Sequence, residues 1–485
     1  MTHARDRAAS LLEIPSDDVG ADLAGFLDEE RDTLLRARAG SGKTTAIVIK
    51  IAHLVLDKGV APEEILAVTF NNAAARQLEA RLRAAGLGDG VRVRTFHALA
   101  QRIVRAHFGP ARRAVFDTTG EDAERLTQIT DEAVDAVINE RFWHFCAGKM
   151  RTRYDKRRDY VESVGREALL SAANFLRARG YGLRDRMSDA WDRGGPIMGN
   201  AMKVALNIDI GLKEAGLLDG AAVLGAAAWT LERELETGRR RPSEAHDVAH
   251  VFIDEYQDCS APYLRLIAAI RDINGATTIT GVGDDWQAIN GFAGADLGFF
   301  EAPERVMDDP VRHDLLCNRR SGAEIVAWGN RVMAEMGCVD GPAVASAARG
   351  AGAVAEMHLG AARDATFIAE RLARQVCRKS GHVALIARRW KVGDHRLFDL
   401  TKRVRARLEA DGWPGRVTGL TAHGSKGLEF DQVLLLDDGS FPLSHPARPI
   451  LEPLIPEADY LREEACLRHV AGTRARDRLD EVVMT

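Results

Sequence analysis

The chain has 485 residues, a net charge of −5, 46% apolar residues and 28% charged residues. This length is too great for one compact domain, and the composition is that of a folded globular protein. Because the overall charge is negative, a nucleic-acid partner would need a local basic surface. The six cysteines form no C-x-x-C pair, which disfavours a zinc module or a disulfide framework. We find no run of about 20 apolar residues and no signal peptide, so we expect a cytoplasmic chain without a membrane partner.

The first 110 residues contain a strand–helix alternation. Residues 1–30 are polar without a strong period, and we expect them to form a loosely held lead-in. Residues 31–110 then alternate strand and helix three times, in the stretches DTLLRARAGSGKTTAIVIKIAHLVLDKG, EEILAVTFNNAAARQLEARLRAAG and VRVRTFHALAQRIVRAHFG. Such alternation predicts a parallel sheet that helices cover on both faces.

The rest of the chain divides into three parts. Residues 111–245 are rich in long helical patterns, which predicts an α-helical accessory insertion. Its basic run Arg151–Arg158 is either a solvated helix face or a contact for a nucleic-acid backbone. Strands return over residues 246–312 and complete the first domain, and a second strand–helix series fills residues 313–485. The sequence therefore predicts an α/β protein with two sheet domains, the first of which is interrupted by helices.

The stretch ARAGSGKTT lies between a predicted strand and a predicted helix, which is typical of a phosphate-binding loop. Backbone N–H groups at a helix start can surround phosphate oxygens. The Lys43 ammonium can bind the outer phosphates, and the Thr44 hydroxyl can hold Mg²⁺. The usual first glycine of the pattern is Ala37 here, which ordinary backbone angles would allow. The nucleotide-binding residues expected in this loop are Ala39, Gly40, Ser41, Gly42, Lys43, Thr44 and Thr45.

The stretch VFIDEYQD places two acidic residues at the end of a buried strand, where ligands bind in α/β proteins. Asp254 can ligate Mg²⁺ directly or through water. Glu255 can orient and deprotonate an attacking water. An acidic strand end by itself is often only a helix cap. Together with the phosphate loop, it predicts hydrolysis of a nucleoside triphosphate.

Further stretches complete an ordered series of motifs. In chain order they are AVTFNNAAARQLEARL, VRTFHALA, IDEYQDCSAPYLRLI, GVGDDWQAINGFAGAD, NRRS, TAHGSKGLEFDQVLL and EEACLRHVAGTRARDRL. The series resembles superfamily 1 helicases of the UvrD/Rep class, over most of residues 33–485 except the helical insertion. Within that class, GDDWQAINGFAGAD and the C-terminal stretch from FPLSHP to GTRAR most resemble bacterial DNA helicase IV. The resemblance implies two RecA-like domains, ATP between them, and 3′ to 5′ movement on single-stranded DNA that crosses both.

The resemblance also implies roles for individual residues. Gln287 would sense the γ-phosphate, and Arg320 and Arg474 would reach it as arginine fingers. Glu429 would bond the ribose or couple the nucleotide to DNA. For Phe96 and Phe292 the motif favours base stacking over a place in the core, whereas Trp286 is left open, and Lys426 is either a DNA contact or a surface charge. The expected DNA-binding residues are Thr69, Phe70, Asn71, Thr95, Phe96, His97, Trp286, Phe292, His423 and Ser425.

Three features depart from the family pattern. No glutamine precedes the phosphate loop to read the adenine edge, and Arg319 replaces the tyrosine that usually stacks on the base. We therefore expect Arg319 to contact the base and base recognition to be relaxed. Only residues 390–416 separate the strand HVALIARR from SKGLEF, so the large second accessory domain of UvrD and Rep is missing. A single copy is therefore expected to translocate but to unwind poorly without a partner or a second copy.

Three functions stay open at this point. The first is a DNA-dependent ATPase and 3′–5′ helicase that acts on single-stranded or tailed duplex DNA, with ATP and Mg²⁺. The second is the ATPase subunit of an anti-phage complex, in which a protein partner supplies a nuclease. The third is a helicase-like regulator that does not translocate, which is disfavoured because the residues of the ATP site are intact.

Overall fold

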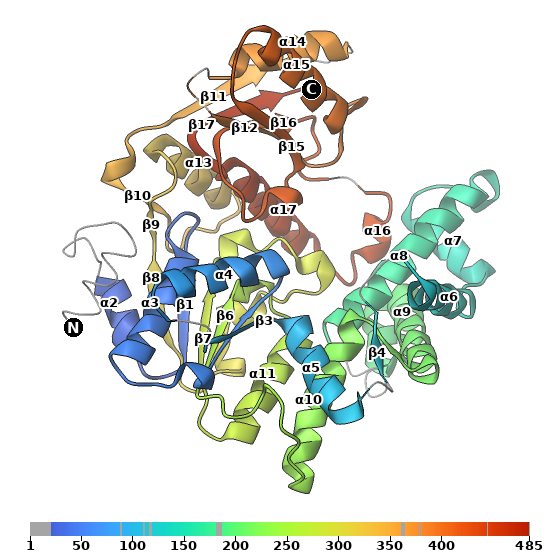
Figure 1. Cartoon of the computed structure of the whole chain (residues 1–485). Helices are drawn as coiled ribbons and strands as arrows, with labels where there is room; N and C mark the ends of the chain where they lie inside the picture. The colour runs from blue at the N-terminus through green and yellow to red at the C-terminus, as the bar shows by residue number, and fades with distance from the viewer. Residues whose placement is uncertain are drawn as a thin grey trace.

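In the computed structural model the chain forms two α/β domains, with a helical accessory domain beside the first (Figure 1). The structure describes residues 21–87, 90–109, 112–115, 119–180, 187–359, 364–377, 379, 381–443 and 445–484. Across these ranges, no helix combines the length and apolar character needed to cross a membrane.

The first domain is built on a six-stranded sheet in the order β3-β2-β6-β7-β1-β8, and every neighbouring pair is parallel. Parallel strands place their carboxyl ends at one edge, so the loops after β1, β6 and β7 meet there. The bounds are β1 (Thr33–Ala37), β2 (Ile65–Thr69), β3 (Arg92–Thr95), β6 (His250–Asp254), β7 (Thr278–Gly283) and β8 (Val311–Leu315).

Helices cover both faces of this sheet, as the alternation predicts. One face packs against α2 (Ala21–Asp28), α3 (Lys43–Leu56) and α4 (Asn72–Ala84). The other packs against α5 (Phe96–Phe108), α10 (Gly220–Thr237), α11 (Ala261–Asn274) and α12 (Gly298–Glu301).

The accessory domain contains α6 (Glu121–Asp135), α7 (Glu140–Lys149), α8 (Arg158–Ala178) and α9 (Met187–Ala215), closed by a short pair of strands, β4 (Arg113–Ala114) and β5 (Leu217–Leu218). One part of its core comes from far along the chain. Ala447 and Ile450, at the short helix α16 (Arg448–Leu451), are buried among the accessory helices. The segment before α17 therefore joins the second domain to the accessory domain, as Figure 1 shows at the right.

The second domain has a five-stranded parallel sheet in the order β11-β17-β16-β12-β15. Its strands are β11 (Ala353–His358), β12 (His382–Ala387), β15 (Arg416–Thr421), β16 (Phe430–Asp437) and β17 (Ala475–Val483). Its helices are α13 (Ala323–Ala334), α14 (Ala365–Gln375), α15 (Leu397–Ala410) and α17 (Glu457–Gly472). Two short pairs complete it, β9 (Cys317–Asn318) with β10 (Val344–Ala345), and β13 (Lys391–Val392) with β14 (His395–Arg396).

The structure corrects three predicted boundaries. Residues 1–30 are not all a loose lead-in, because α2 buries Leu23, Phe26 and Leu27 against the first sheet. The first domain extends to residue 315 because β8 pairs with β1; the polar middle of VRHDL hid this edge strand. The insertion ends before α10 rather than at residue 245, because the apolar stripe of α10 packs on α5 and α11.

We expect Ile450→Ala to loosen the accessory domain although residue 450 belongs to the second half of the chain. Ile450 is fully buried, and emptying such a site costs about 2–5 kcal/mol. Hydrogen exchange measured by mass spectrometry should show faster exchange of the amides of α7 and α8. The matched control is Leu428→Ala, which changes an exposed side chain and should leave that exchange unchanged. Equal protection of α7 and α8 in both variants would contradict the packing described above.

Candidate active site

The site begins at the loop between β1 and α3. Gly40 and Gly42 have φ values of 72° and 100°, which glycine adopts far more readily than other residues. This turn brings backbone N–H groups to the start of α3, a helix end that favours anions. Lys43 begins α3 and donates from Nζ to the carbonyl oxygen of Ala37 at 3.3 Å. Within the described part of the chain, the buried Ser41 hydroxyl has no hydrogen-bond partner, which fits a donor for a bound phosphate.

Two carboxylates follow β6 at the same sheet edge. Burial and the adjacent Glu255 raise the pKa of Asp254 to about 7. Burial acts in the same direction on Glu255, but Lys426 and Lys43 outweigh it and lower the pKa of Glu255. Glu255 has a left-handed backbone with φ 56° and accepts a hydrogen bond from Gln257 at 2.5 Å. Glu255 is therefore an oriented, ionised group, as a general base requires.

Gln287 joins the two domains from the short 3₁₀ helix η6 (Asp285–Gln287) after β7. Its side chain is buried, and Nε2 donates to Asp284 Oδ2 at 2.6 Å. Its Oε1 accepts a bond from Arg474 Nη2 of the second domain at 3.1 Å. A second-domain lysine, Lys426, donates to the Gln287 carbonyl oxygen at 3.2 Å. The expected γ-phosphate sensor therefore contacts both domains.

Arg320 lies against the phosphate loop. A Cβ atom placed on Gly40 would lie 2.7 Å from the Cβ of Arg320, so no larger residue fits between the two segments. Arg320 Nη2 pairs with Glu429 Oε1 at 2.7 Å, whereas Nη1 is buried and finds no hydrogen-bond partner among the described residues. Glu429 also accepts from Arg476 Nη2 at 2.7 Å. Glu429 therefore forms ion pairs with two arginines, Arg320 and Arg476. Its contact with a ribose stays a prediction.

Arg474 follows α17 and is almost completely buried. It donates from Nε to the carbonyl oxygen of Val470 at 2.9 Å. Burial, together with the nearby positive charge of Arg320, lowers the pKa of Arg474 to about 9. Two guanidinium groups that repel each other in a buried cleft favour an anion between them. Arg474 is thus close enough to Arg320 to feel its charge, and contact of either guanidinium with a γ-phosphate stays a prediction.

Arg319 is also at the phosphate loop. Its backbone N–H donates to the carbonyl oxygen of Gly40 at 2.9 Å, and Nη1 donates to the carbonyl oxygen of Ser41 at 3.2 Å. The structure shows this contact with the loop, and stacking of Arg319 on a base stays a prediction.

A buried arginine that we did not predict stabilises the site. Arg38 Nη1 lies 2.7 Å from both Asp284 Oδ1 and Asp285 Oδ1, and its guanidinium lies 3.9 Å from the ring centre of Trp286. Arg38 also donates to carbonyl oxygens of residues 340–341 in the second domain at 2.6 and 2.7 Å. The only sequence feature that could have pointed to Arg38 is its place inside the glycine-rich motif. The residues that it contacts come from distant segments, so the sequence alone did not predict its role.

Lys426 is not a surface charge, one of the two alternatives that the sequence left open, and its ion pair disfavours the other, a DNA contact. Its Nζ bonds Asp258 Oδ2 at 2.5 Å, and the side chain is largely buried. Because Asp258 follows the acidic pair on the first domain, this ion pair is a further link between the domains beside Asp254 and Glu255. Buried charges are stable only when they are paired in this way.

The best candidate for DNA stacking is Phe292, in the short 3₁₀ helix η7 (Gly291–Ala293). Its side chain is 58% exposed, and its ring lies edge-on to His423 at 5.5 Å. His423 lies in η10 (His423–Ser425) of the second domain, so the two expected DNA residues meet across the domain boundary. Glu463 of α17, which we did not predict, accepts a hydrogen bond from the Phe292 N–H at 3.4 Å.

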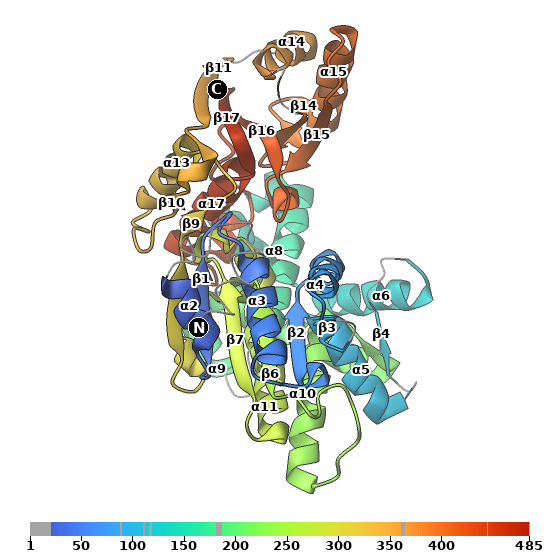
Figure 2. The same cartoon turned by 60° about the vertical axis from the view of Figure 1, so that its left-hand side comes forward.

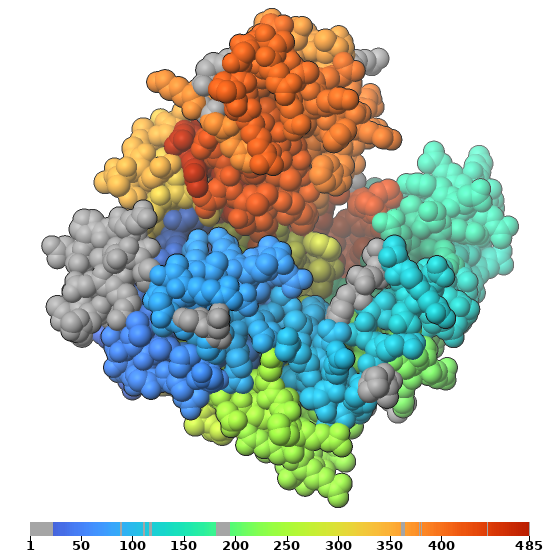
Figure 3. Space-filling view, viewed as in Figure 1, coloured from blue at the N-terminus to red at the C-terminus, as the bar shows by residue number. Residues whose placement is uncertain are grey.

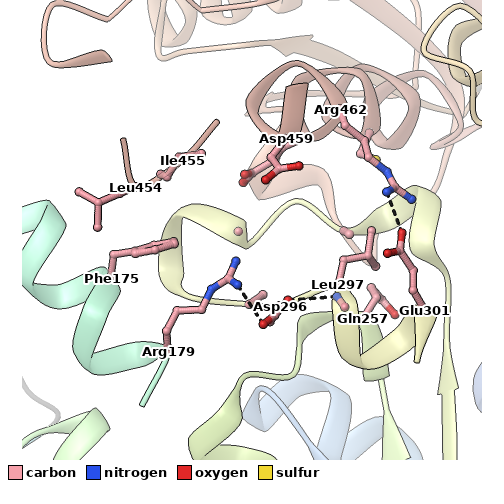
Figure 4. A pocket seen from close by; sticks show the side chains of 16 residues that line it. Phe175, Arg179, Gln257, Asp296, Leu297, Glu301, Leu454, Ile455, Asp459 and Arg462 are labelled. Atoms are coloured by element: carbon pink, nitrogen blue, oxygen red, sulfur yellow. Dashed lines mark hydrogen bonds and ion pairs between the residues drawn. The ribbon is translucent and has the colours of Figure 1, made fainter. Parts of the chain in front are cut away.

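A cavity of about 310 Å³ lies beside the loop that contains Phe292 (Figure 4). It is bounded by the end of α8, by the segment that connects η6 to α12, and by α17. Arg179, which caps α8, pairs with Asp296 of the segment at 3.0 Å. Arg462 of α17 pairs with Glu301 of α12 at 2.8 Å. The loop with Phe292 is therefore in contact with all three domains.

Four expected DNA contacts are contradicted by the structure. Phe96 is fully buried in the core of the first domain, and Trp286 is 1% exposed between Arg38 and His469. Ser425 is also buried, and its hydroxyl donates to the Ala422 carbonyl oxygen at 2.7 Å. The buried Thr69 hydroxyl donates to the Asn71 carbonyl oxygen at 3.2 Å. Motif membership alone could not separate a core side chain from an exposed one.

The other expected DNA contacts stay predictions. Asn71 is exposed at the start of α4. Thr95 is only 8% exposed, and its hydroxyl oxygen caps α5 by accepting from the Ala98 N–H at 3.2 Å. Phe70 is half-buried against Tyr263, with 5.2 Å between ring centres. His97 is half-buried, and burial lowers its pKa.

The residues fit a bound Mg²⁺. Mg²⁺ prefers oxygen ligands and keeps several waters, and Asp254 and Thr44 offer a carboxylate and a hydroxyl at one edge of the sheet. A carboxylate whose pKa burial raises also gains most from a neighbouring cation.

These features together define a P-loop nucleotide site between two RecA-like domains. Family comparison makes the assignment specific. The UvrD/REP helicase N-terminal domain matches residues 23–307, and the UvrD-like helicase C-terminal domain matches residues 397–481. The chain belongs to the UvrD/Rep family of helicases.

Relatives differ in how much of their length the chain covers. It is 27% identical to DNA helicase IV of Escherichia coli over 95% of this chain and 67% of the relative. It is 29% identical to ATP-dependent DNA helicase UvrD2 of Mycobacterium tuberculosis, over 64% of this chain and 44% of the relative. It is 27% identical to ATP-dependent DNA helicase Rep of Escherichia coli, over 54% of this chain and 35% of the relative.

We expect Asp254→Asn to stabilise the metal-free, nucleotide-free protein at pH 8 while it abolishes turnover. The pKa of the Asp254 carboxyl is about 7 in the folded protein, against an ordinary 3.8. Between pH 4 and pH 7 the folded state therefore keeps a proton that the unfolded state has released. Because of this difference, the free energy of unfolding of wild type falls as pH rises through this range. The asparagine of the variant has no carboxyl proton to lose, so its stability lacks this pH dependence. Its melting temperature should therefore exceed that of wild type at pH 8, and the difference should disappear at pH 4. A difference that does not change with pH would contradict the burial of this charge.

Proposed function

We propose that this chain is an ATP-dependent translocase that moves 3′ to 5′ along single-stranded DNA and opens tailed duplexes. One observation supports it most: two arginines of the second domain reach the site of the first, Arg320 against the phosphate loop and Arg474 in a hydrogen bond to Gln287. Planar guanidinium groups match the charge that spreads over the γ-phosphate oxygens during hydrolysis. Nucleotide binding and hydrolysis would therefore change how strongly the two domains are joined.

In the proposed reaction, a water oxygen attacks the γ-phosphorus, and the bond from that phosphorus to the bridging oxygen of the leaving ADP breaks. Glu255 accepts the proton of the water. Lys43, Arg320 and Arg474 donate to the phosphate oxygens as their charge grows. Mg²⁺, held through Asp254 and Thr44, would neutralise charge on the outer phosphates when it is bound.

The coupling to DNA follows from the position of α17. Near its middle, Glu463 bonds the loop of Phe292, and just beyond its end, Arg474 bonds Gln287. Between these points the Cys466 Sγ lies 3.7 Å from the Asp285 carbonyl oxygen. Because a helix moves as a unit, closure of the cleft around ATP would shift the support of the stacking residue, which is how a cleft motion can become a step along DNA.

ATPase assays with and without single-stranded DNA test this function. Wild type should hydrolyse ATP faster when DNA is added, and Lys43→Ala should lose turnover. Arg320→Ala should lower kcat at least about a hundredfold while nucleotide binding, measured by titration, changes little, because its donor acts mainly in the transition state. Arg320→Lys should not restore the rate, since lysine lacks the planar fork.

The control for this experiment is Arg31→Ala, which removes an exposed arginine that pairs with Glu29 and Asp309. Its turnover should equal that of wild type. The proposal would fail if wild type did not respond to DNA, or if Arg320→Ala kept full turnover. Displacement of streptavidin from a 3′- or 5′-biotinylated strand would report the direction of movement.

We also propose that base recognition is relaxed. The residues before the phosphate loop contain no glutamine, and Arg319 stands where a tyrosine is usual. We expect kcat/KM for ATP to exceed that for GTP by less than about a hundredfold, because the side chains that would discriminate the base edges are missing. Arg319→Ala should raise KM for both nucleotides more than it lowers kcat. A stronger preference for ATP would show that other groups read the base.

A further inference from the structure

The second domain has an exposed aromatic and basic surface that the chemistry above does not use. We name it the hairpin surface; it comprises residues 388–405, with β13, β14 and the first half of α15. The segment contains seven basic and two acidic residues, although the whole chain has a net charge of −5. One of the seven, Arg388, is largely buried and pairs with Glu464, so the other six are the candidates for phosphate contacts. Its Trp390 and Phe398 side chains are 61% and 70% exposed. Aromatic groups beside cations on an exposed surface indicate a binding site.

Hydrogen bonds hold the backbone of the hairpin in place. Strand β13 pairs with β14, and the Leu397 N–H donates to the Trp390 carbonyl oxygen at 2.9 Å, which fixes the base of the hairpin. At the other end, the Gly393 N–H donates to Asp438 Oδ2 at 2.7 Å, beyond β16. The backbone that carries Trp390 is therefore held in place, so the hairpin itself would lose little conformational freedom when a ligand binds.

The hairpin surface adjoins the expected DNA site. It follows β12, whose last residue Ala387 is the register partner of Thr421 at the end of β15. The chain after β15 leads directly to His423, the neighbour of Phe292. Figure 2 shows β14 near β15, and Figure 3 shows the second domain (orange) above the furrow that separates it from the first.

We propose that the hairpin surface binds single-stranded DNA, with Trp390 stacking on a base and the basic side chains contacting phosphates. The inference rests on the proposed function and extends its DNA path beyond Phe292 and His423. Exposed base faces match an aromatic platform, and a phosphate backbone matches the local positive charge. A duplex hides its base faces in the stack, so single strands fit this surface better.

Binding of a fluorescein-labelled oligothymidylate, followed by anisotropy, tests the inference. Trp390→Ala should weaken binding about tenfold or more, because removal of one aromatic platform costs about 5- to 150-fold in affinity. The matched control is Trp229→Ala, on α10 of the first domain, where the side chain is 46% exposed. It should leave both binding and basal ATPase unchanged. The double variant Lys391→Gln, Arg396→Gln should reduce the slope of log affinity against log salt by about 0.7 for each phosphate that is no longer neutralised.

The outcomes separate this inference from the proposed function. If Phe292→Ala weakens binding but a folded Trp390→Ala does not, the hairpin surface is no DNA site and the proposed function stands. If wild type does not bind the oligonucleotide, both ideas fail. If Trp390→Ala weakens only the binding of duplex DNA, the hairpin surface binds a duplex. If the variant loses only self-association, measured by sedimentation, the surface binds a second copy of the chain. Either result overturns the inference. Circular dichroism of each variant confirms that its fold is intact.

Discussion

The hydrogen bond between Gln287 of the first domain and Arg474 of the second is the contact on which the geometry of the site depends. It continues a buried polar chain in which Arg38 pairs with Asp284 and Asp284 accepts from Gln287. Buried charges are costly unless they are paired, so this chain of bonds favours one arrangement of the two domains. The ion pair of Lys426 with a first-domain carboxylate adds a second crossing.

The same burial prepares the site for its ligands. The pKa of Asp254 is raised and that of Arg474 is lowered, because both groups are taken out of water. A cation beside Asp254 and an anion beside Arg474 would remove these penalties, so ligand binding and the electrostatics of the cleft are linked. Catalytic groups are commonly found where such shifts coincide with a cleft.

The segment that contains Phe292 belongs to the first domain and is in contact with both of the others. It bonds Glu463 of the second domain, and Arg179 of the accessory domain pairs with Asp296 a few residues further on. The accessory core in turn includes Ile450 from the second half of the chain. Any movement of one domain against another therefore acts on the loop of Phe292, and the proposed hairpin surface would extend the proposed DNA path on the second domain.

The sequence by itself determined the two parallel sheets, the phosphate loop, the acidic pair and the order of the motifs, because these depend on local spacing and on strand–helix alternation. The resemblance also predicts that Arg320 and Arg474 reach across the cleft as arginine fingers, which stays a prediction. The tertiary structure decided which motif residues are exposed: Phe292 is available, whereas Phe96 and Trp286 are buried by segments distant in sequence. It also decided the roles of Arg38, Lys426 and Ile450, since a buried contact between distant segments leaves no periodic signal in either one.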